Sequence, residues 1–88
     1  MAIVNKTVNI LTATTTVVKT GEGRVSHLIA VGGTMGNVTI YDNTSAAGTV
    51  LFGPATPTAG GLIVADLPFG IGLTIVTAAA TAISGAVR

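Results

Sequence analysis

Charged side chains are scarce in this chain, and this scarcity limits what it can fold into more than any other feature. Only 8% of the 88 residues are charged and 49% are apolar, whereas charged residues make up about 25% of an average soluble domain. The charged residues are Lys6, Lys19, Glu22, Arg24, Asp42, Asp66 and Arg88. They form no basic cluster that could neutralise phosphates, which argues against a nucleic-acid-binding protein. The apolar content and the net charge of +1 also argue against intrinsic disorder.

The chain is long enough for one domain, residues 1–88, and too short for a second core. A domain of this size buries only about 60% of the surface that its unfolded chain exposes, so small domains commonly need a disulfide, a metal or a partner. The sequence contains no cysteine and one histidine, which leaves a partner as the support. We therefore expect an oligomer in which much of the nearly uncharged surface is interface.

The composition favours strands and turns over helices. The chain contains fifteen Thr, eleven Val, eight Ile and twelve Gly, and β-branched residues are enriched in strands. Apolar and polar residues also alternate, as around Val8 and Ile10 or Val38 and Ile40, which is the period of a half-buried strand. The segments predicted as strands are residues 6–12, 14–20, 24–31, 37–42, 49–52, 62–65, 71–77 and 81–87. Seven to eight short strands predict an all-β fold, a small antiparallel β-sandwich or jelly-roll-like domain.

Turn residues predict how these strands are connected. Residues 37–52 and residues 73–87 each resemble a hairpin with a loop of small residues. Residues 53–61 contain Pro54 and Pro57, which predicts an exposed loop or a sheet edge. Residues 66–70 are expected to turn the chain, and residues 78–80 to form a loop.

The sequence offers no reactive constellation. His27 is the only imidazole, and the alternation with Val25 and Ile29 places it on a predicted buried face, in the core or at a subunit interface. The acidic residues show no paired-carboxylate spacing. Residues 42–45 carry oxygen ligands but lack the repeated acidic residues of a calcium loop, so we assign them to a turn. We predict no catalytic residue, no cofactor and no metal site, and a protein that is not an enzyme.

Several segments resemble small virion structural proteins of tailed bacteriophages, the capsid decoration or cement proteins. The resemblance rests on residues 37–44 (NVTIYDNT) followed by residues 46–50 (AAGTV). It extends to residues 17–21 (VVKTG) before His27 and Leu28, to residues 72–77 (GLTIVT) and to Arg88. The resemblance implies a β-sandwich or jelly-roll subunit that coats a capsid, commonly as a trimer seated on the major capsid protein.

This resemblance leads us to expect a non-enzymatic decoration protein that binds the head shell as a homo-oligomer, most simply a trimer, and stabilises it. It would be made in the host cytoplasm and lie on the outer surface of the capsid, with no nucleic-acid or membrane partner. Residues 1–6 are predicted as an N-terminal arm that reaches a neighbouring subunit. The candidate capsid or subunit contacts are Ala2, Ile3, Val4, Asn5, Lys6 and His27.

Two other functions fit the sequence. The protein could be a tail or head-fibre component of the virion, which location on the particle would distinguish. A small membrane-active, holin-like protein is the other alternative. It requires a helix over residues 67–87, a stretch without charged residues that is interrupted by Pro68 and several Gly.

Overall fold

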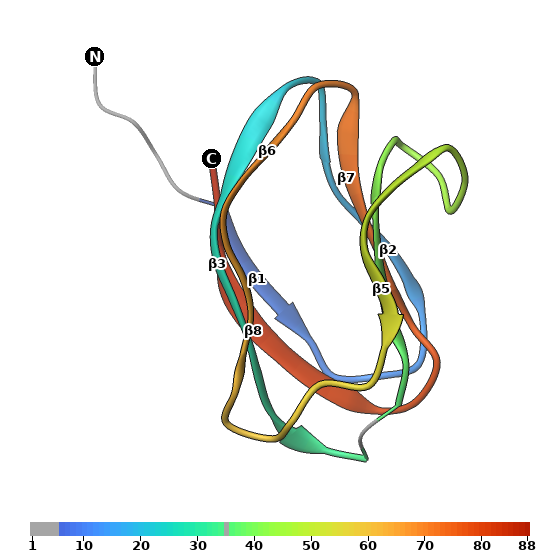
Figure 1. The fold of residues 1–88 in the computed structure, drawn as a ribbon, viewed down its shortest axis with the longest axis vertical. Helices are drawn as coiled ribbons and strands as arrows, with labels where there is room; N and C mark the ends of the chain where they lie inside the picture. Colours follow the sequence, from blue (N-terminus) through green and yellow to red (C-terminus); the bar gives the residue numbers. More distant parts are fainter. Residues whose placement is uncertain (1–5, 35) are drawn as a thin grey trace.

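The computed structural model describes residues 6–34 and 36–88, and within these ranges it consists of eight β-strands and no helix (Figure 1). The strands are β1 (Lys6–Ile10), β2 (Thr15–Thr20), β3 (Gly23–Gly33), β4 (Val38–Asp42), β5 (Thr49–Ala55), β6 (Leu62–Phe69), β7 (Gly72–Thr77) and β8 (Thr81–Val87). The all-β fold class predicted from composition and alternation is confirmed.

The strands form two four-stranded antiparallel sheets that face each other. Sheet A has the order β1-β8-β3-β6 and sheet B the order β2-β7-β4-β5. The pairings are nested: β1 with β8, β2 with β7, β3 with β6 and β4 with β5. A long antiparallel ribbon closed by the β4–β5 hairpin and wrapped into two sheets is the jelly-roll arrangement. The fold is therefore a small eight-stranded jelly-roll sandwich.

One of the two predicted hairpins is wrong. Residues 37–52 do form a hairpin, since β4 pairs with β5. Residues 73–87 do not, because β7 belongs to sheet B and β8 to sheet A. The loop of residues 78–80 is instead an arch that connects the sheets. Both strands turn their apolar faces inward across the core, and alternation alone cannot distinguish an arch from a hairpin.

The predicted turn at residues 66–70 is also wrong. The strand continues to Phe69, whose side chain is buried in the core. Pro68 is tolerated because β6 is an edge strand of sheet A, where no regular ladder hydrogen bond is lost on the open side. Pro54 lies likewise in β5, the edge strand of sheet B, which confirms the sheet-edge alternative for the start of residues 53–61.

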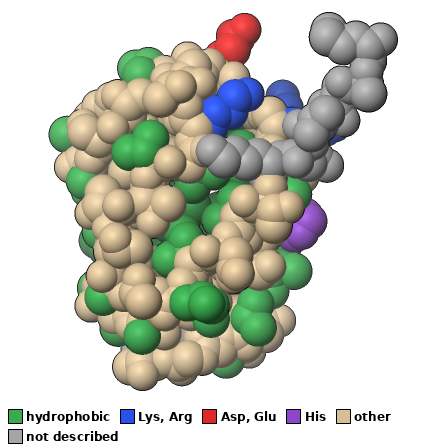
Figure 2. Space-filling model, turned by 180° about the vertical axis from the view of Figure 1, so that it is seen from behind, with side chains coloured by type: hydrophobic (Ala, Val, Ile, Leu, Met, Phe, Trp, Pro, Cys, Tyr) green, Lys and Arg blue, Asp and Glu red, His purple; other side chains and the backbone are tan. Residues whose placement is uncertain are grey.

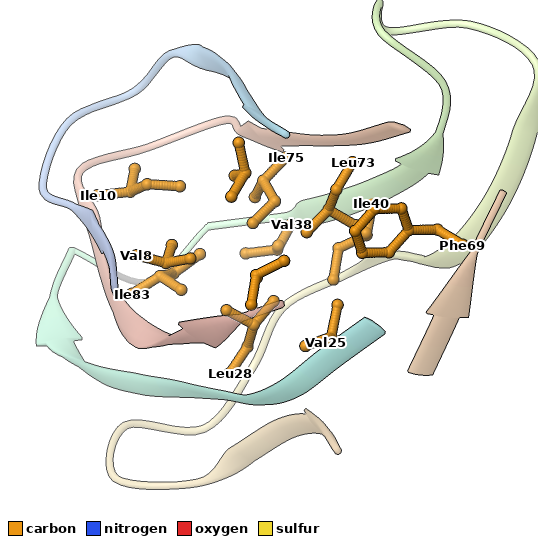
Figure 3. Packing of buried hydrophobic residues seen from close by; sticks show 12 residues of the cluster. Val8, Ile10, Val25, Leu28, Val38, Ile40, Phe69, Leu73, Ile75 and Ile83 are labelled. Atoms are coloured by element: carbon orange, nitrogen blue, oxygen red, sulfur yellow. The ribbon is translucent and has the colours of Figure 1, made fainter. Parts of the chain in front are cut away.

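The core lies between the sheets and is built from the inward side chains of both (Figure 3). Leu28 and Ile83 of sheet A pack toward Ile40 and Ile75 of sheet B, and all four are fully buried. The remaining buried apolar side chains of the cluster are Val8, Ile10, Val18, Val25, Val38, Phe69, Leu73 and Val87. Burying one such side chain contributes about 1.5–3 kcal/mol, so this single cluster is the main source of stability.

Candidate functional site

Charged side chains gather at one end of the sandwich, the charged end. It is formed by residues 21–22, 43–48 and 70–71 and by the end of β8. The Gly21 N–H donates to the Ile71 carbonyl (2.8 Å), and the Arg88 N–H donates to the Arg24 carbonyl (2.9 Å), which brings these segments together. Arg24 and Asp66 form an exposed ion pair at 2.8 Å. Figure 2 shows the charged side chains of one face in its upper half and none in its lower half.

Asp42 fastens the turn between β6 and β7 at this end. Its carboxylate accepts hydrogen bonds from the backbone N–H groups of Gly70 (3.1 Å), Ile71 (2.8 Å) and Gly72 (3.4 Å). These bonds, first of all the one from Ile71, favour the ionised form and lower the pKa of Asp42 below its ordinary value of 3.8. Because N–H donors surround the carboxylate, it is directed at backbone rather than at a cation, in agreement with its assignment to a turn.

The opposite end, the uncharged end, is formed by the connections at residues 11–14, 34 with 36–37, 56–61 and 78–80. None of these segments contains a charged residue. Backbone hydrogen bonds join them: the Thr34 N–H donates to the Ala80 carbonyl (3.1 Å), and the Ala78 N–H donates to the Asn37 carbonyl (2.9 Å). The molecule therefore has a charged end and an uncharged end.

Two buried threonines hold the uncharged end together. The Thr77 hydroxyl donates to the Thr12 carbonyl (2.7 Å) and accepts from the Thr14 N–H (3.0 Å). The Thr81 hydroxyl donates to the Thr34 carbonyl (3.0 Å) and accepts from the Gly36 N–H (3.0 Å). Each hydroxyl is donor to one backbone carbonyl and acceptor for one backbone N–H of a neighbouring connection. The loops are thus fixed by internal hydrogen bonds, without any ionic side chain.

A group of exposed apolar side chains lies on the outer face of sheet A toward the uncharged end. Ile29 pairs with Leu62 across β3 and β6, and Val31 follows two residues later on β3. Leu11 follows β1, two strands away and next to β8. Leu11, Val31 and Leu62 are each about 60% exposed, and Ile29 is 36% exposed. We call Leu11, Ile29, Val31 and Leu62 the end patch. Neighbouring apolar side chains of this kind commonly mark an interaction surface.

His27 does not lie on the buried face predicted for it. A β-bulge between Val25 and His27, opposite β8, shifts the alternation by one residue. Val25 and Leu28 therefore both point inward and are fully buried, while His27 is exposed on the outer face of sheet A. It cannot be a core residue, but the outer face leaves it available as a contact.

The other candidate contacts are placed only in part. Ala2, Ile3, Val4 and Asn5 lie outside the described residues, and Lys6 opens β1 opposite Val87. His27 is paired with Ala86, which in turn is paired with Thr7. Sheet A therefore brings His27 and the beginning of β1 to the same side of the molecule, two strands apart.

A groove of about 200 Å³ runs between β1 and β2, along one open side of the sandwich. It is lined by Thr7, Val8, Asn9, Ile10, Thr16, Val17 and Val18, none of which is charged. Figure 2 shows a hollow on this side with hydrophobic side chains at its floor. Pockets for small organic ligands are commonly about 300–1,000 Å³, so this groove is better suited to a few side chains of an extended peptide.

The described residues offer little for other chemistry. They contain no group of three or more His, Cys, Asp or Glu side chains that could hold a metal ion. They also contain no helix long and apolar enough to cross a membrane. Residues 67–87, the helix required by the membrane-active alternative, form the end of β6 together with β7 and β8, so that alternative loses the element it depends on.

The end patch and the groove were not among the residues predicted from the sequence. The separation of charge could have been predicted from the sequence, because the turns of an antiparallel sandwich fall alternately at its two ends. The groove could not, since it depends on which strands become edges. In comparisons with known proteins, no family model, curated protein or solved structure matches the chain.

Proposed function

We propose that the protein is a structural subunit of a tailed-phage virion, a decoration protein that binds the outside of the head as an oligomer and stabilises the shell. The observation that carries this proposal is the separation of charge, which leaves one end of the jelly roll, as far as the structure describes it, free of ionic side chains and next to the end patch. The fold supports it by analogy alone, because jelly rolls serve in viral capsids and in many other proteins.

The proposal assigns an orientation to the subunit. The uncharged end and the end patch face the shell, while the charged end faces water. Apolar and neutral polar groups can be removed from water at low cost when their hydrogen bonds are already made within the protein, as those of the Thr77 and Thr81 hydroxyls are. Burying charged groups would cost far more, so the charged end is the poorer docking surface.

The oligomer makes weak individual contacts effective. Each copy presents one small apolar patch, and a trimer would present three patches in a fixed arrangement. Once the first patch is bound, the others act at a high effective concentration. A cement function needs this property, because the shell gains stability only while neighbouring capsid proteins are held at the same time.

A labelling experiment tests both the location and the orientation. The natural chain contains no cysteine, so Glu22→Cys marks the charged end alone and Ala59→Cys the uncharged end alone; both positions are exposed. Each variant is added to heads of the encoding phage that lack this protein. Its reaction with a maleimide is followed by mass spectrometry, first free and then bound.

We expect both variants to react when free, and only Glu22→Cys to react at its free rate when bound to heads. Ala59→Cys should be protected at least tenfold. Equal reaction rates on heads would refute the orientation. Absence of binding to heads would refute the decoration function. Gold labelling of the protein in intact virions gives its location: label on tails rather than heads would also refute the decoration function and would support the tail or fibre alternative.

A further inference from the structure

The four edge strands of the two sheets differ in how they are protected against pairing with another chain. On β5, Gly53 has a φ of 82° and is followed by Pro54; on β6, Asp66 has a φ of 53° and is followed two residues later by Pro68. Such interruptions prevent a further strand from pairing along an edge.

The described parts of β1 and β2 contain no proline and no residue with positive φ. On β2, a bulge near Val18 and the adjacent Lys19 interrupt only the half nearer the charged end.

The two unprotected edges lie on the same side of the sandwich. β1 is the first strand of sheet A and β2 the first strand of sheet B, and the groove runs between them. Val8, Ile10 and Val18 form its apolar floor, with Val17 at its rim 45% exposed. Backbone groups of two edge strands therefore flank an uncharged groove with an apolar floor, which is the arrangement that accepts an extended peptide by β-strand addition.

We propose that this groove binds residues 2–5 of a second copy of the chain as an added β-strand. This inference rests on the proposed function, and it names the site that receives the predicted arm. Residues 2–5 read Ala-Ile-Val-Asn; they are uncharged like the groove and contain two strong strand formers. As an extended strand they span roughly 13 Å, close to the length of the five-residue edge of β1.

The segment fits a neighbouring copy better than its own. Residues 2–5 lead directly into Lys6, the first residue of β1. To lie along the edge of its own β1, the chain would have to reverse direction, and a hairpin turn uses at least two residues. About two residues of the segment would then remain for pairing. Donated to another copy, all four can pair, and head-to-tail donation of this kind closes into a ring when the rotation allows it.

The test uses the full chain, a variant that lacks residues 2–5, and a matched pair of substitutions. Val17→Lys places a charge at the groove. Val50→Lys is the control, because Val50 is 46% exposed against 45% for Val17 and lies on β5, the opposite edge strand of sheet B. Mass is measured by sedimentation in solution, and binding of a fluorescent peptide with the sequence of residues 1–7 is measured by anisotropy with the truncated chain. A sheet-type circular dichroism spectrum checks that every variant is folded.

We expect the full chain to be an oligomer and the truncated chain to be a monomer that binds the peptide. Val17→Lys should weaken peptide binding at least tenfold, and Val50→Lys by less than twofold. An unchanged mass after truncation, or equal peptide binding by the two lysine variants, would overturn the inference. No heads are present in this experiment, so its failure leaves the proposed function standing. Conversely, if the protein assembles through the groove but does not bind heads, the proposed function is overturned and this inference stands.

Discussion

Truncation of Leu62 to alanine is the most direct test of whether the end patch contacts the shell. The side chain is 62% exposed, and Leu62→Ala removes three carbons. At about 0.8 kcal/mol for each buried carbon, covering the exposed fraction in an interface contributes about 1.5 kcal/mol per copy. A difference of about 1.4 kcal/mol is a factor of ten in affinity. We therefore expect Leu62→Ala to weaken binding to heads roughly tenfold per copy, and more in an oligomer that binds through several patches.

Ile71→Ala is the matched control for this substitution. Ile71 is 59% exposed, nearly as much as Leu62, and lies at the charged end. Substitutions at such exposed positions usually change the free energy of unfolding by no more than about 0.5 kcal/mol, so both variants should unfold at the same urea concentration as the natural chain. Titration of labelled protein onto heads measures the affinity. Equal losses for the two variants, or no loss for Leu62→Ala, would refute the assignment of the end patch to the shell.

Three further predictions concern stability, measured by urea unfolding. The lowered pKa of Asp42 means that its carboxylate stabilises the fold above about pH 4 and that this contribution is lost as pH falls through the folded pKa; the stability deficit of Asp42→Asn at pH 7 should therefore shrink at pH 3. Thr77→Val removes the hydroxyl that bonds to Thr12 and Thr14 and should cost about 1–3 kcal/mol, whereas Thr77→Ser should cost less. Gly85→Ala would place a Cβ against the backbone of β3 and should cost about 1–3 kcal/mol, while Gly32→Ala, whose Cβ meets nothing within 4 Å, should cost less than about 1 kcal/mol.

Local patterns were sufficient to predict most of the strands. Residues 81–87 were predicted with the bounds that β8 has, and residues 14–20 differ from β2 by one residue. Alternation of apolar and polar residues is a property of the strand itself, so a sequence can show it directly. The fold class followed, because many short strands separated by turn residues leave few architectures other than a sandwich or barrel.

Features that depend on a second strand could not be predicted in this way. The exposure of His27 follows from a bulge opposite β8, and the bulge exists only in the pairing of the two strands. The sheet to which β7 belongs is likewise fixed by its partners β2 and β4. The groove could not be predicted for the same reason. It exists because β1 and β2 have no further neighbouring strand in their sheets.

The separation of charge connects sequence order to the proposed orientation. In this topology the connection between β4 and β5 and the crossings β2–β3 and β6–β7 lie at one end, and the other four connections lie at the opposite end. Glu22 lies in the β2–β3 crossing and Asp42 borders the β4–β5 connection. Asp66 belongs to β6, which finishes at the same end, and Arg88 directly follows β8, which also finishes there. The charged positions thus follow the alternation of ends along the chain. Charges interspersed over the surface favour solubility, and a subunit with one end against a shell, as proposed, needs them only at the end that faces water.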